Sequence, residues 1–88
     1  MNHPPPKKVA ALRYDPTRDQ TPKVVAKGRG KVAERILALA RENNIPMVTD
    51  HNLVHLLESL DINTDIPAEL YQAVAEVLVF VYRMNQQR

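Results

Sequence analysis

The chain has 88 residues, no cysteine and a formal net charge of +2. One small domain fits this length and a second does not, and without cysteine neither disulfides nor thiolate metal sites can stabilise it, which favours a reducing, cytoplasmic location. Residues 1–8 lack the apolar core of a signal peptide, and the most apolar run, residues 70–82, is interrupted by Gln72 and Glu76 and is too short to span a bilayer.

Charge is unevenly distributed along the sequence. Residues 1–31 carry eight Lys or Arg and two Asp, which gives +6, whereas residues 32–88 carry four Arg and eight acids, which gives −4. A basic first third predicts attraction to an acidic protein, an anionic lipid surface or nucleic acid. Charge alone does not choose among these partners.

The predicted elements begin after a proline-rich tail. Residues 1–8 contain three successive prolines and are expected to form a disordered, extended tail. Residues 9–14 predict a strand, residues 15–22 a polar turn with two prolines, and residues 23–27 a second strand.

A strand, a helix and a further strand are predicted around the two glycines of the chain. Apolar residues at helical spacing predict a half-buried helix over residues 31–43, and residues 45–48 predict a very short strand. Two strands joined through a helix are expected to be parallel, with a right-handed crossover.

Two more helices complete the predicted domain. Leucines at i, i+3, i+4 and i+7 predict a helix over residues 52–60, capped by Thr49 or Asp50. Pro67 suits the first turn of a last helix. The apolar surface of that helix exceeds what one core face uses, so the helix is either sandwiched in the core or presents a docking or dimer face.

These elements predict an α/β fold. We expect a single small domain at residues 9–84, with a mixed sheet of about three strands flanked by three helices, and a C-terminal tail at residues 85–88.

Motifs for metals, phosphate and catalysis are weak. His51 and His55 have the i, i+4 spacing of two metal ligands, but the glutamate of the zinc-protease motif is missing, so no metal site is expected. The turn from Gly28 to Lys31 is too short for a phosphate-binding loop. No base stands at a motif spacing from Ser59, so the sequence predicts neither an enzyme nor a cofactor.

Four sequence blocks point to a known family. They are residues 11–16 (ALRYDP), 24–28 (VVAKG), 44–46 (NIP) and 66–78 (IPAELYQAVAEVL), the last followed by residues 81–83 (VYR). On these blocks the chain resembles the cytoplasmic C-terminal domain of the FlhB and YscU family (FlhB-HrpN-YscU-SpaS), the export-switch proteins of flagellar and virulence type III secretion. The resemblance covers almost all of residues 9–83.

In that family a membrane-embedded half precedes this domain, and the domain cuts itself at an Asn-Pro-Thr-His loop. The resemblance places the four loop positions on Pro4, Pro5, Pro6 and Lys7. Only the proline of the motif is matched there. Because cleavage needs an asparagine side chain that cyclises onto its own carbonyl carbon, self-cleavage is not expected.

The resemblance implies a binding function. The chain is expected to be a free-standing counterpart of the released C-terminal fragment, which docks on the type III or flagellar export apparatus and influences protein export or substrate specificity. It implies a cytoplasmic protein that reaches the inner-membrane apparatus only through its partner.

The resemblance also suggests how partners are held. The family's strand before the cleavage motif is missing here, so we expect an open sheet edge that is completed by the membrane half of an FlhB-type protein or by a second copy in a homodimer. The candidate partner-binding residues are Arg13, Lys27, Arg29, Lys31, Tyr71, Val79 and Tyr82. The alternative is a small nucleotide- or nucleic-acid-binding regulator that uses the same basic region, although no stacking platform or reading helix is present.

Overall fold

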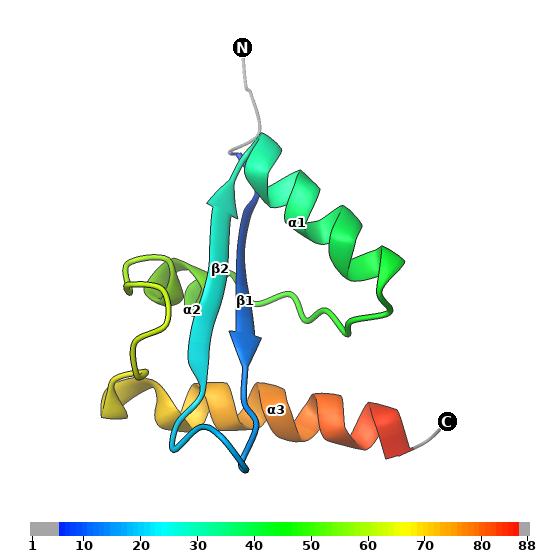
Figure 1. Ribbon diagram of the computed structural model, residues 1–88. Coiled ribbons are helices and arrows are strands. Elements are labelled where there is room, and N and C mark those ends of the chain that lie inside the picture. Colours follow the sequence, from blue (N-terminus) through cyan, green and yellow to red (C-terminus); the bar gives the residue numbers. More distant parts are fainter. Residues whose placement is uncertain (1–5, 87–88) are drawn as a thin grey trace.

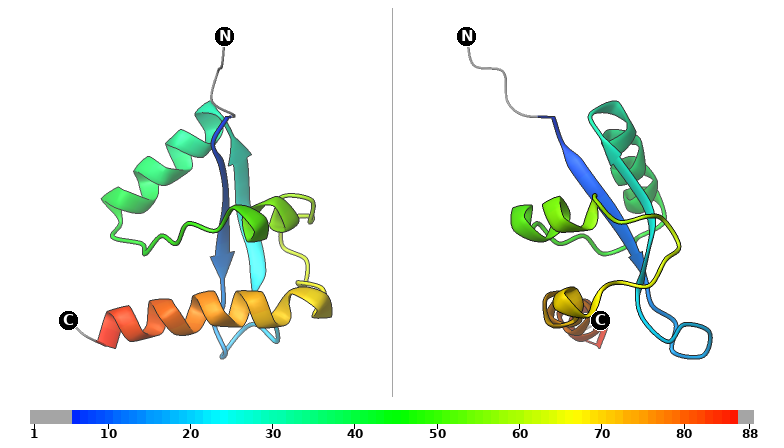
Figure 2. Two further views of the ribbon diagram at one scale, coloured as in Figure 1. Left: turned by 180° about the vertical axis from the view of Figure 1, so that it is seen from behind. Right: turned by 90° about the vertical axis from the view of Figure 1, so that its left-hand side faces the viewer.

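A computed structural model describes residues 6–86 as a small α/β domain. Its elements, in chain order, are β1 (Lys8–Arg13), β2 (Lys23–Arg29), α1 (Lys31–Glu42), α2 (His51–Leu57), the one-turn 3-10 helix η1 (Ala68–Leu70) and α3 (Tyr71–Gln86). The two strands form a hairpin with α1 and α2 on opposite sides, and α3 crosses its turn end (Figures 1 and 2). The predicted α/β class and the three helices are confirmed.

The hairpin is antiparallel along its whole length. Lys8 lies opposite Arg29 at one end and Arg13 opposite Lys23 at the other, with one register irregularity between them. Cross-strand partners share a face of the ribbon, so Ala11, Ala26 and Gly28 give one face small residues, beside Val9, whereas Lys8, Ala10, Lys27 and Arg29 lie on the other.

Local hydrogen bonds reverse the chain between β1 and β2. The carboxylate of Asp15 accepts bonds from the N–H and hydroxyl of Thr17, at 2.9 and 2.6 Å. The Asp15 carbonyl accepts a further bond from the N–H of Asp19 at 2.7 Å. This turn sets the two strands side by side, which makes their pairing antiparallel.

The predicted parallel crossover is wrong. Residues 45–48 form no strand, and the sheet has two strands within residues 6–86 rather than about three. The chain leaves α1 through Asn44, whose φ is +56°, and Pro46 has no N–H to donate to a ladder. Met47 and Val48 are therefore 45% and 42% exposed, on a segment that runs past the hairpin to α2 (Figures 1 and 2).

Helix α1 approaches the small-residue face of the hairpin. Ala33 is fully buried there. A Cβ on Gly28 would lie 2.4 Å from Cγ1 of Val32, so only glycine permits this approach. Much of α1 stays exposed, including Val32 at 56% and Leu39 at 51%.

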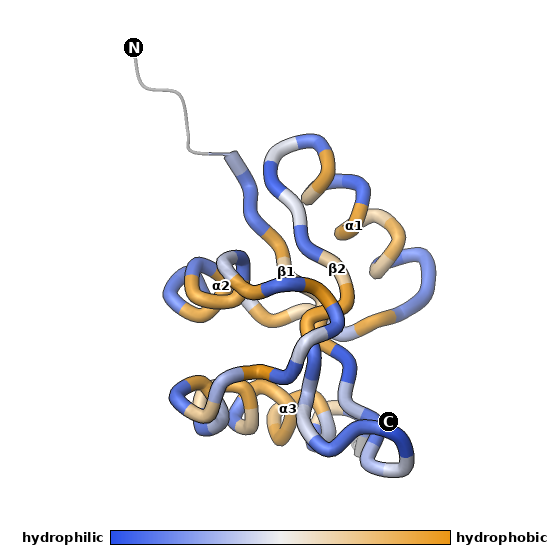
Figure 3. Tube along the Cα trace, turned by 60° about the vertical axis from the view of Figure 1, so that its left-hand side comes forward, coloured by the Kyte–Doolittle hydropathy of each residue, from blue (hydrophilic) through white to orange (hydrophobic). Residues whose placement is uncertain are grey.

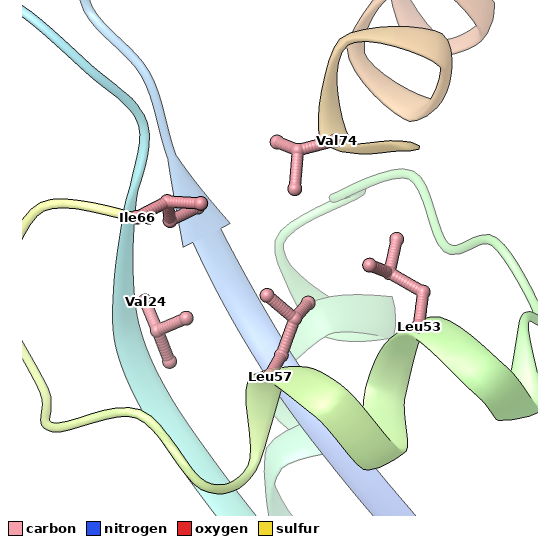
Figure 4. Close-up of a cluster of buried hydrophobic side chains, with 5 residues drawn as sticks. All are labelled: Val24, Leu53, Leu57, Ile66 and Val74. Atoms are coloured by element: carbon pink, nitrogen blue, oxygen red, sulfur yellow. The ribbon is translucent and has the colours of Figure 1, made fainter. Parts of the chain in front are cut away.

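The main core lies on the other face of the hairpin, between β2, α2 and α3. Its buried side chains point toward one another in Figure 4; they are Val24, Leu53, Leu57, Ile66 and Val74. Asp50, one of the two predicted caps, accepts a hydrogen bond from the N–H of Leu53 at 3.0 Å and so starts α2.

Some predicted boundaries shift. Helix α2 ends at Leu57, because a turn takes up the residues that follow, and Pro67 precedes η1, which leads into α3. Strand β1 begins at Lys8 and α3 runs to Gln86, so both extend beyond residues 9–84. Of the predicted tails, residues 1–5 and 87–88 lie outside the described residues.

Replacing Leu57 with Ala should destabilise the domain, whereas Leu56→Ala should not. Leu57 is 3% exposed and its neighbour Leu56 is 47% exposed on the same helix. We expect the free energy of unfolding to fall by about 2–4 kcal/mol for L57A and by less than about 1 kcal/mol for L56A. Urea denaturation measures both, and equal losses would contradict this core.

Candidate functional site

Most of the basic residues predicted to bind a partner contact acidic or carbonyl groups of the chain itself. The guanidinium of Arg13 donates to both carboxylate oxygens of Asp19, with Nη2 to Oδ1 at 3.0 Å and Nε to Oδ2 at 3.2 Å. These bonds hold the pKa of Asp19 below its ordinary value. Arg13 therefore supports the hairpin turn.

Lys27 and Arg29 connect β2 to the end of α2. The Lys27 ammonium donates to the main-chain carbonyls of Glu58, at 3.0 Å, and Leu60, at 2.6 Å. Arg29 makes two bonds to the Glu58 carboxylate, at 2.7 and 3.0 Å. Lys31 is the fourth of the predicted basic residues. It is exposed, and among residues 6–86 it takes no part in these ion pairs and hydrogen bonds.

Glu58 is the centre of this ionic cluster. Besides Arg29, the ammonium of Lys8 lies 3.2 Å from Oε1, and Nδ1 of His55 lies 3.6 Å from it. The hydrogen bond from Arg29, together with that from Lys8, lowers the pKa of Glu58 from 4.5 to about 2. Cations that neutralise one carboxylate are poorly placed to bind phosphate, which counts against the nucleic-acid alternative.

The histidines do not form a metal site with the residues described. His51 is exposed, His55 faces Glu58, and within residues 6–86 no three His, Asp or Glu side chains gather closely enough to hold an ion. Two of the predicted cleavage-loop positions, Pro4 and Pro5, lie outside the described residues.

The other two predicted cleavage-loop positions, Pro6 and Lys7, are exposed and directly precede β1. The carbonyl of Lys7 accepts a hydrogen bond from the N–H of Gly30 at 2.8 Å, which closes the open end of the hairpin.

An apolar cavity of about 260 Å³ lies where the hairpin turn meets the start of α3. Its walls come from three separate segments and comprise Tyr14, Gln20, Thr21, Pro22, Ile66, Tyr71, Val74 and Ala75. Tyr14 and Tyr71 are 44% and 46% exposed, whereas Ile66 and Val74 are 1% exposed. An apolar floor with aromatic walls suits an inserted apolar side chain.

Only Tyr71 of this cavity was among the residues that the sequence predicted. Val74 and Ala75 also lie on α3, and the remaining walls come from turns and loops, where helical periodicity gives no signal. The two prolines that bound the turn at residues 15–22 are the one clue to the site in the sequence.

An exposed apolar stripe runs from the cavity along α3. Tyr71, Ala75, Val79 and Tyr82 follow one another at helical spacing and are all exposed. Tyr82 is 64% exposed and Val79 48% exposed. Figure 3 shows hydrophobic positions along much of this helix. The structure thus places the three predicted α3 residues, Tyr71, Val79 and Tyr82, on one stripe.

The two outer edges of the hairpin differ. Residues 63–66 cover part of the β2 edge, where the N–H of Asn63 donates to the Val24 carbonyl at 2.8 Å and Lys23 pairs with Asp65 in an isolated bridge. Within residues 6–86, β1 pairs with β2 alone. Its outer edge therefore has backbone groups available for another strand.

Comparison with known proteins identifies the family. A family model described as the FlhB HrpN YscU SpaS Family matches residues 5–81. The chain belongs to this family. The crystal structure of the PscU C-terminal domain is similar to this chain: it is 32% identical with a TM-score of 0.79, and the match covers 84% of this chain and 95% of that one.

The cytoplasmic domain of FlhB from Shewanella putrefaciens is also similar. It is 37% identical, has a TM-score of 0.81, and the match covers 85% of this chain and 63% of that one. The predicted resemblance is confirmed.

Related sequences differ in length. The flagellar biosynthetic protein FlhB of Escherichia coli (strain K12) is 44% identical over 79 residues, which are 89% of this chain and 21% of that protein. A Bacillus subtilis (strain 168) protein named uncharacterized protein YlqH is 38% identical over 82 residues, which are 93% of this chain and 88% of YlqH. The chain therefore spans about a fifth of FlhB and most of YlqH.

Within residues 6–86, no helix has both the length and the apolar character that a bilayer crossing requires.

Replacing Glu58 with Gln should flatten the acid dependence of stability. The pKa of about 2 in the folded chain lies below the ordinary 4.5, so ionised Glu58 contributes stability that is present above pH 4.5 and is lost as the pH falls toward 2. Urea denaturation across this window should show a shallower loss for E58Q than for the wild type.

Glu34→Gln is the matched control, because Glu34 is exposed on α1 and makes no ion pair with the described residues. E34Q should keep the wild-type slope. Some slope should also remain in E58Q, because the pKa of Asp19 is lowered too. A wild-type slope in E58Q would show that the Glu58 cluster does not stabilise the fold.

Proposed function

We propose that the chain is a non-catalytic binding module that acts as the C-terminal cytoplasmic domain of an FlhB-type export switch. It docks on the flagellar or type III export apparatus from the cytoplasmic side and influences which proteins are exported. The observation that supports this most strongly is the match to the FlhB cytoplasmic domain, at 37% identity and a TM-score of 0.81. Pro4 stands where cleavage would need an asparagine, so the module acts without cutting itself.

The cavity and the α3 stripe are the proposed contact for a partner segment. The apolar floor and the exposed Tyr14 and Tyr71 can receive an apolar side chain, and Val79 and Tyr82 extend the contact along α3. Arg13, Lys27 and Arg29 support this site by holding the hairpin and α2 in place, rather than by touching the partner.

The outer edge of β1 is the proposed second contact. A strand from the membrane half of an FlhB-type protein can add there through backbone hydrogen bonds. Exposed apolar residues on the segment that passes the hairpin, Ile45, Met47 and Val48, can cover its side chains.

Export in living cells tests the proposed function. In cells whose full-length switch protein is truncated before its cleavage motif, supplying this chain separately should restore export of late flagellar substrates. Ala75→Phe, which fills the cavity from its exposed wall, should lower the restored export by about tenfold or more. Gln72→Phe adds the same side chain to the polar strip of α3 and should leave export unchanged. A folded, abundant chain that restores nothing would contradict the proposal.

A peptide with the sequence of the family's strand before the cleavage motif tests the β1 edge. Amide hydrogen exchange of β1 should slow by about tenfold or more when the peptide is added. A peptide with proline at its centre cannot complete the ladder and should give little protection. Unchanged exchange in β1 with the unmodified peptide would show that this edge does not take a strand.

A further inference from the structure

One face of α3 lies beside the cavity stripe, shares Val79 with it and includes two opposite charges. Glu76, Val79, Phe80 and Arg83 follow the spacing i, i+3, i+4 and i+7, which places them together on the helix surface. All four are exposed, with Phe80 at 53% and Val79 at 48%. They lie on the half of α3 that projects beyond the hairpin, drawn in orange to red in Figures 1 and 2.

The charges occupy the two ends of this face. Glu76 lies one turn before the Val79 and Phe80 pair, and Arg83 lies one turn after it. Neither residue makes an ion pair with another described residue. When a second copy of this face is turned end for end, its base lies opposite the acid of the first copy and its apolar centre lies opposite the apolar centre. The face is therefore complementary to itself.

We propose that this face binds a second copy of the chain, in an antiparallel pair of α3 helices related by a two-fold axis between Val79 and Phe80. The midpoint between residues 79 and 80 is also the midpoint between residues 76 and 83. Glu76 of each copy therefore faces Arg83 of the other, and the two ion pairs flank the contact of Val79 with Val79 and Phe80 with Phe80. A parallel pair would place like charges opposite one another.

The size of the face sets the strength of this contact. One face of a single helix buries less than about 1,200 Å² in total, the range of transient interfaces. The chain is therefore a monomer when dilute and forms the dimer at high concentration. This self-association does not depend on the proposed role in export.

Sedimentation equilibrium of the full chain, across a series that reaches about 1 mM, tests the proposal. The apparent mass of the wild type should rise toward twice that of one chain. Glu76→Arg and Arg83→Glu each place two like-charge pairs in the interface and should weaken association by about tenfold or more. The double variant E76R/R83E restores both pairs in reversed order and should associate to within about threefold of the wild type.

Two further variants separate this contact from other causes. Glu34→Arg makes the same change in charge as E76R on the exposed surface of α1 and should leave association unchanged. Phe80→Asp, at an exposed position, should abolish association while the circular dichroism melting curve stays close to that of the wild type. A wild type that stays monomeric, a dimer that survives the single reversals, or a double variant as weak as the single ones would each overturn the proposal.

Discussion

The rest of the domain depends on the bonds that Lys27 makes to the end of α2. The carbonyls of the residue that caps a helix and of the turn after it have no partner within the helix, and a lysine on the neighbouring strand can supply one. Lys27 donates to the carbonyls of Glu58 and Leu60, and Arg29, two residues farther along the same strand, fixes the side chain of Glu58. These bonds set the distance and angle of α2 against the hairpin. Leu53 and Leu57 thereby reach the core, and the loop after α2 returns along the β2 edge to place Ile66.

The same bonds give the basic residues internal contacts that charge alone does not reveal. Composition shows that the first third of the chain is basic, but the acceptors of Lys27 lie 31 and 33 residues away along the sequence. Nothing in local spacing identifies such partners. A lysine whose aliphatic stem lies along an apolar surface can extend its ammonium to a polar group at the edge of that surface. The sequence therefore does not identify these internal contacts, and the role of the basic residues in binding a partner stays a prediction.

Helical periodicity predicted most of the fold, because the three helices bury one face each. The pairing of the strands was harder to predict from the sequence. A short β-branched or apolar run predicts extended backbone, but pairing depends on the turns that connect the runs. Asp15 reverses the chain through hydrogen bonds that its neighbours supply, and this makes β1 the partner of β2. At residues 45–48 the proline and the left-handed Asn44 before it prevent the pairing that the crossover pattern suggested.

Helix α3 shows how one helix can serve a core and a surface. Val74 is buried in the core, while Val79, Phe80 and Tyr82 remain exposed farther along, where α3 projects beyond the hairpin. A uniformly apolar surface would adhere to many partners. Glu76 and Arg83 interrupt it, so a partner that cannot pair with both charges must leave one of them desolvated, and that penalty disfavours unselective contacts. The excess of apolar residues that the sequence revealed in α3 is thus divided by two charges into faces of different selectivity.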